Sequence, residues 1–254
     1  MRALKQCGLI ILCCLVPPNI GRAADLSIDH ARQYRSCITL SYREPWQAFE
    51  AAETWAALNG GAAARHCAAL ALLEAKQYDR AAQRLETLAA TLPPEHRPSP
   101  GNVMAQAANV WLLGGRPELA LQAIELALQY DPDKASHLID RGRIQAEQGN
   151  LAAALADLDR AVVLAPRDDD AAAFRASALR RLGRQADAMA AIERALELNP
   201  NNPSARLERG ILRLQMGDRD GARQDWLRTV LDHEGTPAGD TAQARLQALA
   251  LNPK

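Results

Sequence analysis

Histidine is the residue type in this chain best suited to proton transfer or metal binding, because its side chain titrates near neutral pH. His233 and Glu234 begin the pattern of a helical zinc motif, but the second histidine of that motif would fall at Pro237. His66 precedes Cys67 directly, and neighbours on a helix point about a third of a turn apart. The other histidines have no partner at a metal-ligand spacing: His30, His96 and His137. We therefore expect no catalytic residue, no metal site and no cofactor.

Cysteine is the other reactive residue type, and the chain has five cysteines. Three of them, Cys7, Cys13 and Cys14, lie in the first apolar segment and would leave with it if that segment is cleaved. The remaining pair, Cys37 and Cys67, favours a disulfide in an oxidising compartment. The alternative is two buried free thiols, which pack as small apolar side chains.

The first 24 residues have the layout of a secretory signal peptide. Arg2 and Lys5 precede an apolar run over residues 8–16, and small residues follow, so we expect cleavage after Ala23 or Ala24. The run is too short for a permanent membrane span. A lipid anchor on Cys13 or Cys14 is the alternative, and a cytosolic protein would have to retain the segment. The sequence therefore predicts a periplasmic or secreted protein without a stable membrane span after cleavage.

Composition indicates a helical protein. The chain of 254 residues is 48% hydrophobic but only 4% aromatic, and it is rich in alanine, the best helix former. Its formal net charge is zero, with 30 basic and 30 acidic residues. That balance argues against a basic nucleic-acid-binding surface or a polybasic membrane patch.

The elements that must position any functional residue repeat every 34 residues. Each unit contains a helix, a glycine suited to ending it, a second helix, and a proline that prevents its continuation. Small residues recur where the paired helices must cross closely, and larger apolar residues follow on the second helix. The recurring positions are Gly115, Gly149, Gly183 and Gly217; Ala108, Gly142, Ala176 and Gly210; Ile124, Leu158, Ile192 and Trp226; and Pro132, Pro166 and Pro200.

This period and pattern resemble the tetratricopeptide repeat family. The resemblance implies an all-α, right-handed solenoid of stacked helix pairs. It covers four regular units over 101–236, a unit at 62–95 with Lys76 in place of the glycine, and a degenerate pair at 25–61. Residues 96–100 form a Pro-rich insert, either a hinge or a longer loop, and residues 237–254 form a capping helix and tail.

In this family the first helix of each unit lines an inner groove, and the resemblance assigns partner-binding positions to it. The candidates are Asn102, Asn109, Leu112, Ile139, Arg143, Ser177, Arg180, Leu207, Ile211 and Leu214. Leu207, Ile211 and Leu214 form the sharpest apolar feature, although they could instead pack against the capping helix. Arg143 and Arg180 could meet a carboxylate of a partner or be solvated.

A second set of arginines is expected to be structural. Arg141 and Arg209 each have an aspartate 16 residues later, Asp157 and Asp225, on the facing helix. An arginine fork suits a carboxylate, so these pairs should stabilise single units. Arg175 lacks such an aspartate, and we expect it to reach Asp157 or Glu208. The tryptophans are expected in the core: Trp46, Trp55, Trp111 and Trp226.

The resemblance implies a non-catalytic scaffold or adaptor in the bacterial cell envelope that binds a partner peptide or helix in its groove. Two alternatives stay open: an accessory subunit of an envelope enzyme complex, and a self-associating structural repeat protein. A protein partner is expected and a nucleic-acid partner is not. The sequence leaves the oligomeric state open.

Overall fold

The computed structural model describes residues 29–251, so the proposed signal peptide and its three cysteines lie outside the described residues. Within that range the chain forms thirteen α-helices and no strand. The helices are α1 (His30–Ser41), α2 (Pro45–Ala57), α3 (Gly61–Glu74), α4 (Tyr78–Thr91), α5 (Pro100–Leu113), α6 (Pro117–Tyr130), α7 (Ala135–Glu147), α8 (Leu151–Leu164), α9 (Asp169–Arg181), α10 (Gln185–Leu198), α11 (Pro203–Gln215), α12 (Arg219–Asp232) and α13 (Pro237–Leu251).

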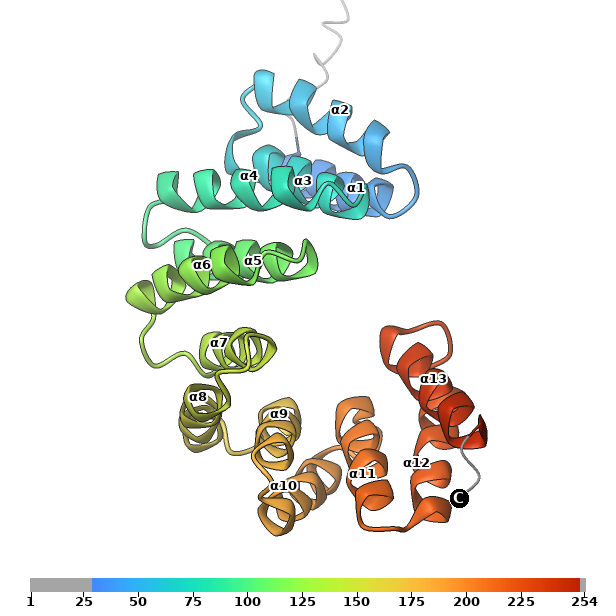
Figure 1. Cartoon of the computed structure of the whole chain (residues 1–254). Helices are drawn as coiled ribbons and strands as arrows, with labels where there is room; N and C mark the ends of the chain where they lie inside the picture. Colours follow the sequence, from blue (N-terminus) through green and yellow to red (C-terminus); the bar gives the residue numbers. More distant parts are fainter. Residues whose placement is uncertain (1–28, 252–254) are drawn as a thin grey trace, which may run out of the picture.

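The helices form an all-α solenoid of stacked antiparallel pairs. Figure 1 shows the pairs following one another along an open curve, from α1–α4 at the top to α13 at the right. Along the middle of the stack, α5 contacts α7, α7 contacts α9, and α9 contacts α11. In Figure 1, α5, α7 and α9 lie toward the hollow of the curve, whereas α6, α8 and α10 lie outside it.

The turn inside each pair depends on one left-handed backbone position. Gly115, Gly149, Gly183 and Gly217 have φ values of 70°, 83°, 76° and 88°, a region that costs glycine little. Lys76 occupies the same turn of the earlier pair with a φ of 58°. The substitution of lysine for glycine therefore keeps the turn, at the cost of placing a side chain in a disfavoured conformation.

Close helix crossings require the small residues that recur in the sequence. A Cβ atom on Gly142 would lie 2.9 Å from Cγ of Leu158, and one on Gly210 would lie 2.8 Å from Cδ1 of Trp226. Both partners are the larger residues predicted on the second helix of the same unit. Glycine at these two positions thus allows the facing side chain to fill the space between the helices.

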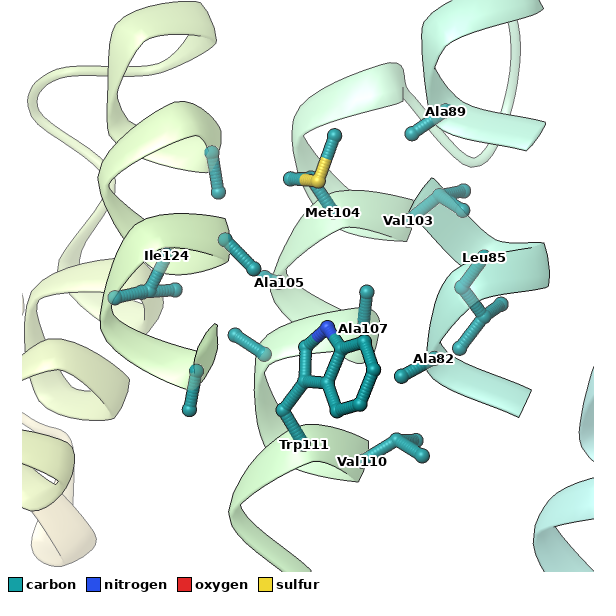
Figure 2. Close-up of a cluster of buried hydrophobic side chains, with 14 of the residues drawn as sticks. Ala82, Leu85, Ala89, Val103, Met104, Ala105, Ala107, Val110, Trp111 and Ile124 are labelled. Carbon is teal, nitrogen blue, oxygen red and sulfur yellow. The ribbon is translucent and has the colours of Figure 1, made fainter. Parts of the chain in front are cut away.

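The core runs from pair to pair because neighbouring pairs share it. Figure 2 shows α5 between α4 and α6, with Val103 near Leu85 of α4 and Ile124 of α6 reaching toward α5. Trp111 fills the centre of this cluster and donates a hydrogen bond from its indole nitrogen to Oε1 of Glu86 at 2.7 Å. Trp55, Trp111 and Trp226 are buried, as expected. Trp46 is not, because its side chain is 49% exposed on α2 and packs edge-on against Phe49.

Polar contacts join the first helices of the stack. Tyr34 of α1 bonds to Nδ1 of His66 on α3 at 2.7 Å, and His66 Nε2 bonds to Gln106 of α5 at 2.7 Å. Cys37 of α1 and Cys67 of α3 lie with their Cα atoms 6.3 Å apart and their sulfur atoms in contact. That Cα separation is one that a disulfide can span.

The last helix covers the end of the stack. Leu246 and Leu249 of α13 pack in one cluster with Trp226 and Ala242. An exposed helix pair at the end of a solenoid would leave this apolar surface in water. At the other irregular point, the segment between α4 and α5 is a loop that folds back on itself, with His96 Nδ1 bonded to the carbonyl oxygen of Pro98 at 3.0 Å.

Candidate partner-binding groove

The first helices of the regular pairs form a hollow in the middle of the solenoid, with a cavity of about 260 Å³. Residues from α5, α7, α9 and α11 line it, so four successive pairs contribute to one site. We call this hollow the central groove, defined by Arg143, Phe174, Ser177, Ser204, Leu207 and Glu208. Its lining combines apolar and polar side chains, which is typical of sites that fix the orientation of a bound chain.

Arg143 lies on one side of the central groove. Its guanidinium carbon is 5.0 Å from the ring centre of Phe174, a cation–π contact between neighbouring pairs. The same guanidinium lies 3.4 Å from Asp140 and 3.5 Å from Asn109, both at the long end of hydrogen-bond distance. The side chain of Arg143 stays 39% exposed. This cation is therefore oriented by the protein and still accessible to an acceptor in the groove.

The carboxyl of Asp140 sits beneath this arginine. Burial raises the pKa of Asp140, while bonds from Asn109 and Arg143 act in the opposite direction. Asn109 also donates to the carbonyl oxygen of Ala105 at 3.2 Å. Asn109 thus serves mainly to hold its neighbours in place.

Glu208 is the second charged group of the central groove, and the protein itself satisfies it. Arg180 donates from Nε to Glu208 at 2.6 Å, and Ser177 donates from its hydroxyl at 2.9 Å. The side chains of Arg180 and Glu208 are only 14% and 16% exposed. Removing one member of such a buried pair leaves the other charge uncompensated. Arg180 therefore meets a carboxylate of this chain, and it joins α9 to α11.

The other predicted polar positions also have internal partners. Asn102 accepts a hydrogen bond from Lys134 at 2.8 Å and lies 3.3 Å from Nε2 of His137. Burial lowers the pKa of His137, so the neutral imidazole is favoured. Leu112 lines the central groove, whereas Ile139 is buried in the cluster around Leu158.

Leu207, Ile211 and Leu214 pack together with the capping helix. All three belong to the cluster that contains Trp226, Leu246 and Leu249. Leu207 alone also lines the central groove. The packing interpretation therefore explains Ile211 and Leu214 without a partner, and the apolar stripe on α11 is a contact with α13.

Sequence reasoning missed the aromatic side chain of the groove. Phe174 lies one position away from the inward positions assigned by the family resemblance, yet it lines the cavity and holds Arg143. The available signal was its rarity, since the chain has only two phenylalanines and this one stands among alanines.

The second arginine set is structural, with one correction. Arg141 makes a bidentate pair with Asp157 at 2.6 and 2.7 Å, and Arg209 pairs with Asp225 at 2.5 and 3.0 Å. Arg175 reaches neither Asp157 nor Glu208. It pairs with Asp159 at 2.5 Å, an aspartate 16 residues before it on α8. The expected partner was wrong because the pair joins consecutive units rather than the two helices of one unit.

Within residues 29–251, no group of three or more histidine, cysteine, aspartate or glutamate side chains is arranged to hold a metal ion. In the same range, no helix combines the length and apolar character needed to cross a membrane. The histidines there are engaged in separate contacts with tyrosine, tryptophan, asparagine or backbone groups.

Known proteins share both the repeat and the fold. Residues 115–178 and 169–212 match two models described as tetratricopeptide repeat. Human FK506-binding protein-like is 36% identical over 94 residues, which are 37% of this chain and 26% of that protein. Human Tetratricopeptide repeat protein 36 is 35% identical over 129 residues, 49% of this chain and 64% of that protein. The chain thus spans less than two thirds of either relative.

Solved structures resemble the solenoid at low sequence identity, so they inform on the fold alone. A tetratricopeptide repeat protein from Parabacteroides merdae has a TM-score of 0.70 at 14% identity, covering 90% of this chain and 86% of its own. MamA from Desulfovibrio magneticus RS-1 has a TM-score of 0.55 at 15% identity, covering 69% and 97%. The repeat matches and the observed fold together place this chain in the tetratricopeptide repeat family.

Proposed function

We propose that the protein is a non-catalytic adaptor that binds an extended segment of a partner protein in the central groove. Tetratricopeptide repeats form protein-interaction scaffolds, and this chain has that architecture. The observation that carries the proposal is the cavity shared by α5, α7, α9 and α11, with Arg143 and Phe174 at its side.

The groove favours a particular kind of segment. Phe174 and Leu207 offer apolar contact, and Arg143 offers a cation held only by long hydrogen bonds. Arg180 is unavailable because Glu208 already occupies it. The proposed partner segment therefore presents one apolar side chain to Phe174 and one carboxylate to Arg143, since an arginine fork binds a carboxylate well.

The proposed setting is the bacterial cell envelope, reached through cleavage of residues 1–24. The contact between Cys37 and Cys67 supports a disulfide there, because such bonds persist in oxidising compartments. An intact mass that starts at residue 24 or 25 would support export. Two freely titrating thiols in the unreduced native protein would contradict the disulfide.

Photo-crosslinking in living cells tests the proposal. A photoreactive residue replaces Ser204, which lines the groove, and the matched control replaces Gln224, an exposed residue of α12. The account predicts a discrete adduct from position 204 that disappears in a Phe174→Ala background. Identical adducts from both positions, or none from position 204, would contradict groove binding.

The alternatives predict different results. A self-associating repeat protein would crosslink to a second copy of itself, and its mass in solution would rise with concentration. An accessory subunit would co-purify with an enzymatic activity. The groove adaptor can remain monomeric and carries no activity of its own.

A further inference from the structure

A second cavity, distinct from the central groove, lies near the start of the solenoid and has a volume of about 280 Å³. Its walls come from α1, α3, the end of α4, the start of α5 and the loop between α4 and α5. We call it the N-terminal pocket. The loop interrupts the 34-residue period, and its residues His96, Arg97 and Pro98 close one side of this pocket. The insert thus builds a wall that a regular repeat would not supply.

The floor of the N-terminal pocket is apolar. Leu88, Leu92 and Val103 are buried there, and Ala62 and Ala63 of α3 contribute small side chains. His66 also lines the pocket, but both of its ring nitrogens already have partners in Tyr34 and Gln106. The floor therefore suits a short apolar group that needs no hydrogen bonds. The volume lies near the lower end for ligand sites, about 300 Å³, which fits a fragment-sized molecule.

The mouth of the pocket carries hydrogen-bond donors. Nη1 of Arg97 donates to the carbonyl oxygens of Glu95 and His96 at 3.0 and 2.9 Å, which uses both of its hydrogens. These bonds hold the guanidinium in place and leave its Nε and Nη2 edge without a bond to the described residues. That edge is the two-donor fork that matches a carboxylate.

His30 supplies a second donor by elimination. The indole nitrogen of Trp55 can only donate, and it lies 3.3 Å from Nδ1 of His30. Nδ1 must therefore accept, so the hydrogen of the neutral ring is on Nε2. Among the described residues that line the pocket, Arg97 has the only formal charge, and no aspartate or glutamate is present. The charge of the mouth favours an anion.

We propose that the N-terminal pocket binds a small free carboxylic acid with a short alkyl chain. The chain packs on Leu88, Leu92 and Val103, and the carboxylate accepts hydrogen bonds from Arg97 and from Nε2 of His30. This site is independent of the proposed partner groove, because it shares no lining residue with the central groove.

Calorimetric titration of the purified protein with hexanoate tests the proposal, with hexanol as the neutral probe of equal chain length. Hexanoate is expected to bind at least about tenfold more tightly than hexanol, because hydrogen bonds to a charged group are the strong ones. Arg97→Gln should abolish that preference, and Arg97→Lys should keep part of it because the charge remains while the fork is lost. Arg97 is exposed in a loop, so both variants should fold.

Two further variants locate the site. Ala63→Leu should fill the pocket and prevent hexanoate binding, whereas Phe174→Ala in the central groove should leave it unchanged. Equal binding of hexanoate and hexanol, no hexanoate binding, or unchanged binding by Arg97→Gln would overturn the proposal. Tighter binding of N-acetyl-leucine than of hexanoate would also overturn it, since the occupant would then be the end of a peptide chain.

Discussion

The two ends of the described chain are held together by different kinds of contact. From α5 to α12, each pair repeats one device, a small residue facing a large one, as with Gly210 and Trp226. From α1 to α4, contacts occur once each, such as Tyr34 with His66 and His30 with Trp55. The repeated contacts define the architecture, whereas the single contacts create local features such as the N-terminal pocket.

The largest expected effect separates a buried tryptophan from an exposed one. Trp111→Ala removes an indole that is 3% exposed and bonded to Glu86, and it should lower the free energy of unfolding by about 3–5 kcal/mol. Trp46→Ala, in the half-exposed position on α2, should cost about 1 kcal/mol or less. Urea denaturation of both variants measures the difference. Equal losses would show that the shared core around α5 does not dominate stability.

A smaller effect tests the repeated small-to-large contact. Gly210→Ala places a methyl group against the Trp226 ring, which is fixed by burial, and should destabilise the protein by about 1–3 kcal/mol. Gly142→Ala meets the flexible end of Leu158 and should cost less. Thermal unfolding of the two variants gives the order. A larger loss for Gly142→Ala would contradict the close-crossing explanation.

The smallest effect concerns the single contacts of the first helices. Burial lowers the pKa of His66 below its ordinary 6.5, and the nearby His96 acts in the same direction. The unfolded chain therefore takes up a proton at a higher pH than the folded one. The stability associated with neutral His66 is fully present above about pH 6.5 and is lost as the pH falls through the lower folded pKa.

Urea midpoints measured across this pH range test that sign. His66→Gln should have a flatter dependence below about pH 6.5 than the parent protein. His137 stays in both proteins and shifts in the same direction, so it contributes equally to each curve. An identical pH dependence in the two proteins would show that His66 titrates alike in the folded and unfolded states.

The fold followed from the sequence because its devices recur at a fixed step. The glycine at each turn, and Lys76 in the same turn, could be placed by counting 34 residues. The groove was harder to predict because its contacts join different units. Arg180 binds Glu208 and Arg143 packs on Phe174 across pair boundaries, and no period within one chain identifies such partners. The N-terminal pocket depends on an insert that breaks the period.

Hydrogen–deuterium exchange of the protein with its crosslinked partner tests the central claim most directly. The account predicts slower exchange in α7, α9 and α11 on binding, with little change in α6, α8 and α10 on the outer side. A Phe174→Ala variant should lose this protection while keeping the fold. Protection confined to the outer helices or to the ends of the stack would contradict binding in the central groove.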